Sequence, residues 1–199
     1  MKRLTQPGYR CLEAARPIAL GAATDSVDFQ NRGSLAIIHR DIVRFQKRTL
    51  DRSLSTFDYL YGYASAADSQ FVLLGIYRPG SDLPTTKFFD ELLAVFEQLV
   101  SNRCAVLVCG DCNVHYDLRD DGNAVRFKEL LQSFGFVQHV TEPTHVRGHT
   151  LDLVITNSEK DVLSLCVGGM ISDYALICFV LPLKKLPVKA QWVTCTAWR

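Results

Sequence analysis

The stretch VCGDCNVH, residues 108–115, contains two interleaved pairs of side chains that suggest different chemistry. Cys109 and Cys112 form a C-x-x-C pair, which is typical of zinc sites and of redox disulfides. Asp111 and Asn113 form a D-x-N pair, whose oxygen atoms suit a hard cation and phosphate chemistry. By itself, D-x-N is more often an Asx turn than a site. The rest of the chain has to decide between these interpretations.

The residues around the stretch favour the oxygen pair. CAVLVCGD, residues 104–111, is a nearly continuous apolar run, which predicts a strand buried on both faces with Asp111 at its end. Chemistry in α/β folds lies where such strands end. A zinc finger would need His145 and His149 as further ligands, but 32 residues separate Cys112 from His145, against a usual spacing of about 12–15. A redox C-x-x-C opens a helix, whereas Cys109 lies within the predicted strand. We therefore expect both thiols to be apolar core groups.

Length and composition predict one soluble domain. The chain has 199 residues, of which 48% are hydrophobic and 22% charged, and the net charge of +1 gives no global basic field that would favour nucleic acid. Seven cysteines, an odd number mostly inside apolar runs, fit reduced, buried thiols of an intracellular protein, nuclear or cytoplasmic. No apolar run reaches membrane-spanning length, and the N-terminus has no signal-like apolar core.

One local run of basic residues leaves two interpretations open. RDIVRFQKRTLDR, residues 40–52, includes Arg44, Lys47 and Arg48. Such a run is usually a solvated face. The alternative is a phosphate-binding surface, to which Arg78 would also contribute.

The apolar pattern predicts helices separated by strands. The expected strands are residues 34–39, 57–65, 70–80, 104–111, 136–140, 150–157, 161–167 and 174–183, and the expected helices are 81–103 and 123–135. Thr85 or Thr86 can cap the first helix, and Gly135 can end the second. We expect an α/β (α+β) domain over residues 1–183, weakly defined before residue 33, followed by an irregular tail at 184–199.

Two further aspartates lie at strands. Asp152 interrupts the apolar strand GHTLDLVIT, where a buried carboxylate needs hydrogen bonds or a cation. Asp173 follows Ser172 directly before the last apolar strand, and Tyr77 ends another strand. If these groups converge with Asp111, their mutual repulsion calls for a cation, which indicates a metal-assisted reaction.

Four segments together resemble one family. GIYRPG, VCGDCNVH, EPTHVRGHTLDLVIT and ISDYALICF stand in the order seen in the exonuclease–endonuclease–phosphatase superfamily. The nearest resemblance, over roughly residues 8–183, is to the apurinic-type endonuclease domain of non-LTR (LINE-type) retrotransposons. It implies a two-sheet sandwich flanked by helices, a Mg²⁺-dependent nuclease that nicks one DNA strand, and a reverse transcriptase domain in the parent element.

The resemblance also implies residue roles. Tyr77 would contact the scissile phosphate, Asp111 would position or deprotonate the attacking water, and Asn113 would orient both. Asp111 and Asp152 would contribute to the metal site, with Thr150 supporting Asp152. Ser172 and Asp173 precede position 174, and Asp173 would orient the side chain there.

The chain departs from the family in two respects. Position 174 is Tyr, where the family has a histidine that stabilises the transition state, and a phenol cannot become a cation near neutral pH. The first strands of the fold, which carry the Asn and Glu metal ligands, are not recognisable, so we expect an N-terminally truncated domain that binds Mg²⁺ weakly. Catalysis would then be weak or lost. The alternatives are a non-catalytic nucleic-acid- or protein-binding relic of the fold, and a fragment that does not fold stably.

Overall fold

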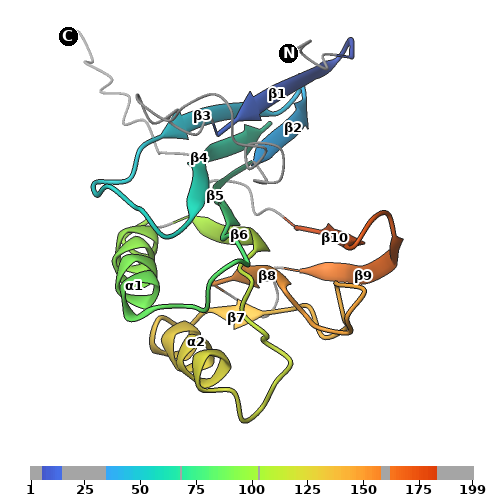
Figure 1. Ribbon diagram of the computed structural model, residues 1–199. Helices are drawn as coiled ribbons and strands as arrows, with labels where there is room; N and C mark the ends of the chain where they lie inside the picture. Colours follow the sequence, from blue (N-terminus) through green and yellow to red (C-terminus); the bar gives the residue numbers. More distant parts are fainter. Residues whose placement is uncertain (1–5, 15–34, 68, 103, 158–161, 183–199) are drawn as a thin grey trace, which may run out of the picture.

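The computed structural model describes residues 6–14, 35–67, 69–102, 104–157 and 162–182 (Figure 1). The strands are β1 (Tyr9–Glu13), β2 (Ala36–Arg40), β3 (Arg44–Arg48), β4 (Asp58–Ala66), β5 (Ser69–Tyr77), β6 (Ala105–Asp111), β7 (Val137–Gln138), β8 (Asp152–Thr156), β9 (Leu163–Met170) and β10 (Ala175–Val180). The helices are α1 (Thr86–Val100) and α2 (Gly122–Ser133). The expected mixed α+β class is confirmed.

Six strands form the central sheet, in the order β3-β4-β5-β6-β8-β7. β4 and β5 form an antiparallel hairpin, β5 and β6 pair in parallel, and β6 pairs antiparallel with β8. Helix α1 connects the two parallel strands, because a parallel pair requires a crossover. Two small antiparallel sheets, β1–β2 and β9–β10, complete the set of described strands.

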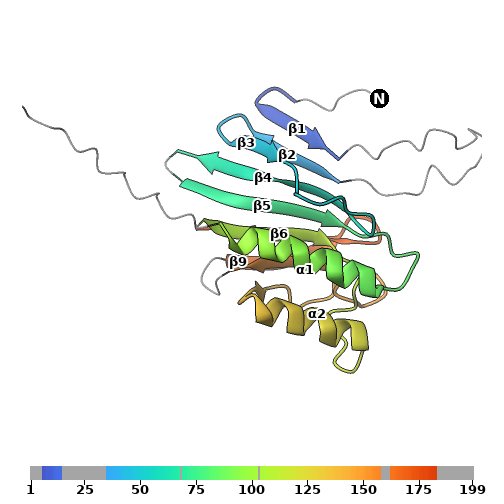
Figure 2. The same cartoon turned by 90° about the vertical axis from the view of Figure 1, so that its left-hand side faces the viewer.

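The two faces of the central sheet pack against different partners. Val72, Leu74 and Ile76 of β5 belong to the large core cluster that contains the buried residues of α1 and α2. Both helices lie along this face (Figure 2). On the opposite face, Leu107 and Val154 belong to a second, smaller cluster with side chains of β9 and β10. Because strand side chains alternate, the residue number along each strand decides which face it serves.

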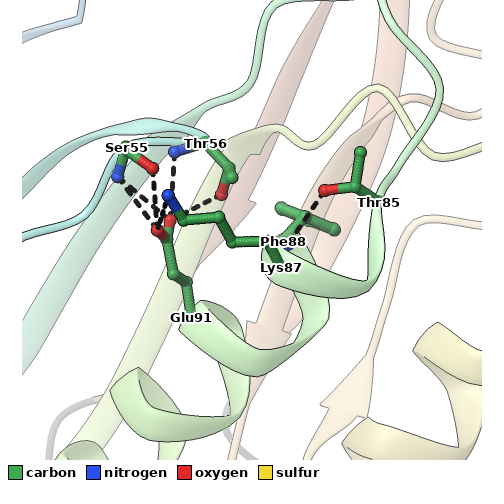
Figure 3. Close-up of polar contacts among 6 residues, drawn as sticks. All are labelled: Ser55, Thr56, Thr85, Lys87, Phe88 and Glu91. Carbon is green, nitrogen blue, oxygen red and sulfur yellow. Dashed lines mark hydrogen bonds and ion pairs between the residues drawn. The ribbon is translucent and has the colours of Figure 1, made fainter.

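Helix α1 is fastened to the loop before β4 (Figure 3). Thr85 caps its start by accepting the Phe88 N–H, as one of the two expected caps. The Glu91 carboxylate accepts hydrogen bonds from the backbone N–H and the hydroxyl of both Ser55 and Thr56, the shortest being 2.6 Å from the Thr56 hydroxyl. Burial tends to raise the pKa of Glu91, but these hydrogen bonds outweigh it and leave the pKa below its usual value.

Helix α2 begins at Asp121, whose side chain accepts the Ala124 N–H, and ends before Gly135, which has a φ of 67°. This positive φ agrees with the expected role of Gly135 at the helix end. Helix α1 meets the segment that follows α2 through aromatic rings: Phe96 makes edge contacts with Phe134 and Phe136, at centroid distances of 5.8 and 4.9 Å.

Three details differ from the sequence-based predictions. β1 was not expected, and β3 lies in the basic run for which no strand was expected. Cys166 and Cys178, expected to be buried, are exposed. Residues 1–5, 15–34 and 183–199, which include much of the weakly patterned N-terminal region and the predicted tail, lie outside the described residues. Neither described helix is long and apolar enough to cross a membrane.

Candidate functional site

Three of the expected site residues lie side by side across the central sheet. Tyr77 at the end of β5 is the register partner of Asp111 on β6, and Asp111 is the register partner of Asp152 on β8. Directly opposed residues on neighbouring strands project from the same face. Leu107 of β6 and Val154 of β8 lie an even number of residues from Asp111 and Asp152, so they project from the same face as these aspartates. The row of Tyr77, Asp111 and Asp152 therefore lies on the face that carries β9 and β10.

The two aspartates form a strained electrostatic pair. Like charges directly opposite each other in a sheet repel. Burial and the neighbouring Asp152 carboxylate raise the pKa of Asp111 to about 6, against hydrogen bonds from Asn113 and Tyr174 and the charge of Arg78. Burial also raises the pKa of Asp152. The Asp152 Oδ2 atom is buried and has no hydrogen-bond partner, so one oxygen of the pair lacks the compensation that burial requires.

Asn113 is held tightly against Asp111. The Asp111 Oδ1 atom accepts the Asn113 backbone N–H at 2.9 Å, which is the Asx turn weighed as the simpler interpretation. The Asn113 Nδ2 group donates to Asp111 Oδ2 at 2.8 Å and to the Arg78 carbonyl at 2.7 Å, so both amide hydrogens are used. A side chain at position 80 would clash with Asn113, because its Cβ would lie only 2.6 Å from the Asn113 Oδ1 atom. Gly80 therefore leaves space for the Asn113 amide.

Arg78 is part of the scaffold of this site. Its side chain is 4% exposed, and its guanidinium donates to the carbonyl oxygens of Cys112, Asp82 and Asn113. These bonds tie the end of β5 to the loop after β6. Arg78 was expected to contact nucleic acid, but a buried guanidinium that is committed to three carbonyls does not belong to a binding surface.

Tyr174 reaches the row from the turn before β10. The Tyr174 hydroxyl and the Asp111 carboxylate lie close enough to shift each other's pKa. Burial and the nearby Asp111 charge raise the pKa of Tyr174 to about 12. The segment is held by a β-bridge between His145 and Tyr174, whose rings meet edge-on with centroids 4.9 Å apart. The phenol therefore stays neutral, and its hydroxyl is engaged with the carboxylate pair.

The loop before β8 contributes two residues that the sequence did not single out for this site. The buried Thr144 hydroxyl oxygen accepts the N–H groups of Leu151 and Asp152, and the Thr144 side chain lowers the pKa of Asp152. The charge of His145 also lowers the Asp152 pKa, against the larger effect of burial. Both residues stand in the segment EPTHVRGHT, but no local pattern indicates that its first half folds back onto Asp152.

Asp58 also belongs to the row and was not expected. It is the register partner of Tyr77 on the other side of β5, which places it two strands from Asp111, roughly 10 Å away. A carboxylate at the second position of the predicted strand 57–65 was the available signal.

The other expected residues lie near the row in supporting positions. Thr150 is buried and its hydroxyl donates to the Glu142 carbonyl, which holds the loop rather than a substrate. Ser172 and Asp173 are exposed, and the Asp173 carbonyl accepts the Val146 N–H.

The basic residues Arg44, Lys47 and Arg48 lie on β3, an edge strand of the central sheet. Lys47 pairs with Gly62 of β4, which lies four residues, or roughly 13 Å, along the strand from Asp58. Arg44 pairs with Ser65 and lies farther from Asp58.

The two cysteines of the opening stretch lie on opposite faces of the sheet. Cys112 belongs to the helix-side cluster, whereas Cys109 pairs with Val154 of the other face. Burial raises the pKa of Cys109 to about 11 and raises that of Cys112 as well. Two thiols directed to different faces cannot share one metal ion or one disulfide. His149, the other candidate zinc ligand, binds Asp117 at 3.1 Å.

The donor atoms present suit a divalent cation in part. Asp111 and Asp152 offer hard carboxylate oxygens, and the unpartnered Asp152 Oδ2 is an atom that a cation would satisfy. Within the described ranges, however, no three His, Cys, Asp or Glu side chains are grouped so as to hold a metal ion. The described residues therefore offer two carboxylate ligands, fewer than such a cation usually takes.

Known structures share this arrangement of strands and helices. The endonuclease domain of TRAS1, a telomere-specific non-LTR retrotransposon, superposes with a TM-score of 0.64 at 12% identity, covering 89% of this chain and 82% of that one. An endonuclease/exonuclease/phosphatase family protein from Bacteroides thetaiotaomicron gives 0.55 at 13% identity, covering 81% and 64%. The fold is that of the endonuclease/exonuclease/phosphatase proteins.

Other structures with the endonuclease/exonuclease/phosphatase fold widen the range of relatives. The human nocturnin catalytic domain gives a TM-score of 0.58 at 15% identity, covering 89% of this chain and 73% of that one. No protein-family model matches the sequence, and no curated protein matches it. The superfamily resemblance read from four short segments is thus confirmed at the level of the fold.

Proposed function

We propose that this chain is a retrotransposon-derived, Mg²⁺-dependent DNA endonuclease-like domain whose phosphodiester hydrolysis is impaired. The observation that carries the proposal is the direct opposition of Asp111 and Asp152, with Asp152 Oδ2 buried and unpartnered. A carboxylate pair without compensating charge destabilises the fold by repulsion, and a bound cation would relieve that repulsion. The likeness to the TRAS1 endonuclease domain supports DNA as the substrate.

Five residues of the site have a role in this proposal. Asp111 and Asp152 would hold Mg²⁺, whose positive charge would offset the negative charge of the phosphate. Asp111 positions the attacking water and accepts its proton. Asn113 keeps Asp111 in place and offers its Oδ1 to that water, while Tyr77 contacts the phosphate. Thr144 holds Asp152 in register.

The impairment follows from position 174. A histidine there would offer a donor to the charge that builds on the phosphate, and removing one such preorganised donor costs about 10²–10³-fold in rate. Tyr174 has a pKa of about 12, so it remains uncharged beside Asp111. A neutral phenol cannot supply the cationic donor that a histidine would offer to the phosphate.

The alternative proposal is a non-catalytic nucleic-acid- or protein-binding domain. Two observations favour it: both Asn113 amide hydrogens are committed within the protein, and Tyr174 is engaged with Asp111. Lys47 and Arg48 on the exposed edge strand would then contribute to binding DNA. In either case, a reverse transcriptase would be the neighbouring domain in a parent element.

A nicking assay separates the two proposals. Supercoiled plasmid is incubated with the protein in Mg²⁺, and a slow conversion to the open circle is expected that Asp111→Ala abolishes. Asp120→Ala, which removes an exposed carboxylate outside the row, is the matched control and should nick like the wild type. DNA binding without nicking, unchanged in Asp111→Ala, would instead establish the non-catalytic function. Nicking that survives Asp111→Ala would refute the assignment of the site.

A further inference from the structure

The hairpin of β9 and β10 brings two cysteines together that lie far from the C-x-x-C stretch. Cys178 of β10 is the direct register partner of Cys166 of β9. Both are free thiols, and both are exposed. Such a pair is distinct from Cys109 and Cys112, whose side chains lie on opposite faces of the central sheet.

Alternation along the hairpin shows that the two thiols project from the same side. Leu165 and Val167 of β9, with Ile177 and Phe179 of β10, pack into the smaller core cluster. Cys166 and Cys178 lie between these residues and therefore project outward. The two sulfur atoms share the outer face of the hairpin, where an oxidant in solution can reach them.

The spacing of an opposed pair suits a disulfide. Directly opposite residues of antiparallel strands have Cα atoms roughly 4.5–5.5 Å apart. A disulfide accepts Cα separations of about 4.4–6.8 Å. The register shifts on both sides of the pair, between Ala175 and Ile177 and between Cys178 and Val180, so the backbone is irregular there and can adjust locally.

We propose that Cys166 and Cys178 form a site of reversible thiol oxidation, in which a low-molecular-weight disulfide such as glutathione disulfide converts the two thiols into one cross-strand disulfide. One cysteine sulfur attacks a sulfur of glutathione disulfide, forms a mixed disulfide and releases one glutathione. The opposing cysteine sulfur then attacks the mixed disulfide and expels the second glutathione. The protein loses two electrons and two protons, and glutathione disulfide gains them as two thiols.

The bond would fasten the hairpin that presents Tyr174. Tyr174 lies in the turn between β9 and β10, and Cys178 follows four residues later on β10. The disulfide closes a loop of about a dozen residues and so is expected to raise the melting temperature by up to about 10 °C. Being exposed, it is expected to be reducible by glutathione, unlike a buried structural bond.

The test treats the native full chain with glutathione disulfide, followed by mass spectrometry and non-reducing peptide mapping. The expected product is two hydrogen atoms lighter than the reduced protein, has a peptide cross-link from Cys166 to Cys178, and returns to the dithiol with reduced glutathione. In the same protein Cys109 and Cys112 should remain unmodified, as an internal control for burial.

Single variants test the order of events. Cys166→Ser should stop at one glutathione adduct on Cys178, and Cys178→Ser should stop at one on Cys166. Unfolding curves that match the reduced wild type will show that both variants fold. Two separate glutathione adducts on the wild-type pair, or a bond between two chains in place of the internal one, would overturn the proposal. So would a cross-link that persists in either variant.

Discussion

The two faces of the central sheet are built from the same strands but serve different ends. On the helix-covered face, every second residue of β5 and β6 packs against α1 and α2 in one large apolar cluster. On the opposite face, the alternate residues meet a smaller cluster, and at the strand ends they are Tyr77, Asp111 and Asp152. Apolar packing stabilises the first face, whereas opposed carboxylates destabilise the second. The site is therefore expected to lower stability, and the sheet can carry it because the helices stabilise its other face.

The largest expected effect lies on the helix-covered face. Phe96 of α1 is fully buried and packs against Phe134 and Phe136, just after α2. Phe96→Ala should lower the free energy of unfolding by about 3–5 kcal/mol, because it removes a large side chain and leaves a cavity. Leu176→Ala, at a residue that is 49% exposed on β10, should change it by less than about 0.5 kcal/mol. Urea denaturation measures both. Equal losses would contradict the burial of Phe96 in the helix-side core.

The next largest effect on stability is expected from the hydrogen bonds that the Glu91 carboxylate accepts from Ser55 and Thr56. Glu91→Gln removes a charged acceptor of several hydrogen bonds and should cost about 1–3 kcal/mol at pH 7. Because the folded-state pKa of Glu91 lies below its unfolded value, its contribution is complete above that unfolded value and is lost as the pH falls through the folded pKa. The difference between variant and wild type should thus shrink below about pH 4.5.

Lys87→Ala is the matched control for this fastening. The Lys87 Nζ atom lies 3.9 Å from Glu91 and the side chain is 66% exposed, so its removal should have almost no effect. Urea denaturation across pH follows all three proteins. A loss in Lys87→Ala as large as that in Glu91→Gln would show that the ion pair, and not the hydrogen bonds to Ser55 and Thr56, holds the loop.

On the opposite face, removing a charge should stabilise the protein. Asp111 has a folded-state pKa of about 6, above its usual 3.8, so the folded state binds the proton more tightly than the unfolded state. Wild-type stability should therefore fall as the pH rises from about 4 to about 6. Asp111→Asn should show a weaker dependence, because only Asp152 with its raised pKa then remains, and it should be about 1–2 kcal/mol more stable at pH 7, measured by thermal unfolding across pH. A variant that is less stable than wild type at pH 7 would refute the unfavourable pair.

A cation should relieve the same repulsion, with the smallest effect. With two carboxylate ligands among the described residues, we expect Mg²⁺ affinity no tighter than millimolar. About 10 mM Mg²⁺ should then raise the free energy of unfolding by no more than about 1.4 kcal/mol. The effect should vanish in Asp111→Asn. Titration calorimetry that finds micromolar binding, lost in this variant, would show that the site holds more ligands than the row supplies.

The sequence by itself determined the elements whose pattern is local. Periodicity located both helices and the strands β4, β5, β6 and β8 within a few residues, because amphipathic spacing and turn residues act over short distances. It also placed Asp111 and Asn113 at the end of a buried strand, since an apolar run that stops at a polar residue is visible without neighbours. The short strands β1 and β3 were not predicted, because few of their residues are buried and they show no clear apolar alternation.

Only the tertiary structure decided which distant residues meet. Strand register places Asp152 opposite Asp111, adds Asp58 to the row and brings Cys166 to Cys178, and no local pattern encodes a register between segments dozens of residues apart. Likewise, Arg78 resembled a surface cation in the sequence, but three backbone carbonyls draw it inside. A buried charge depends on partners that only the folded chain supplies.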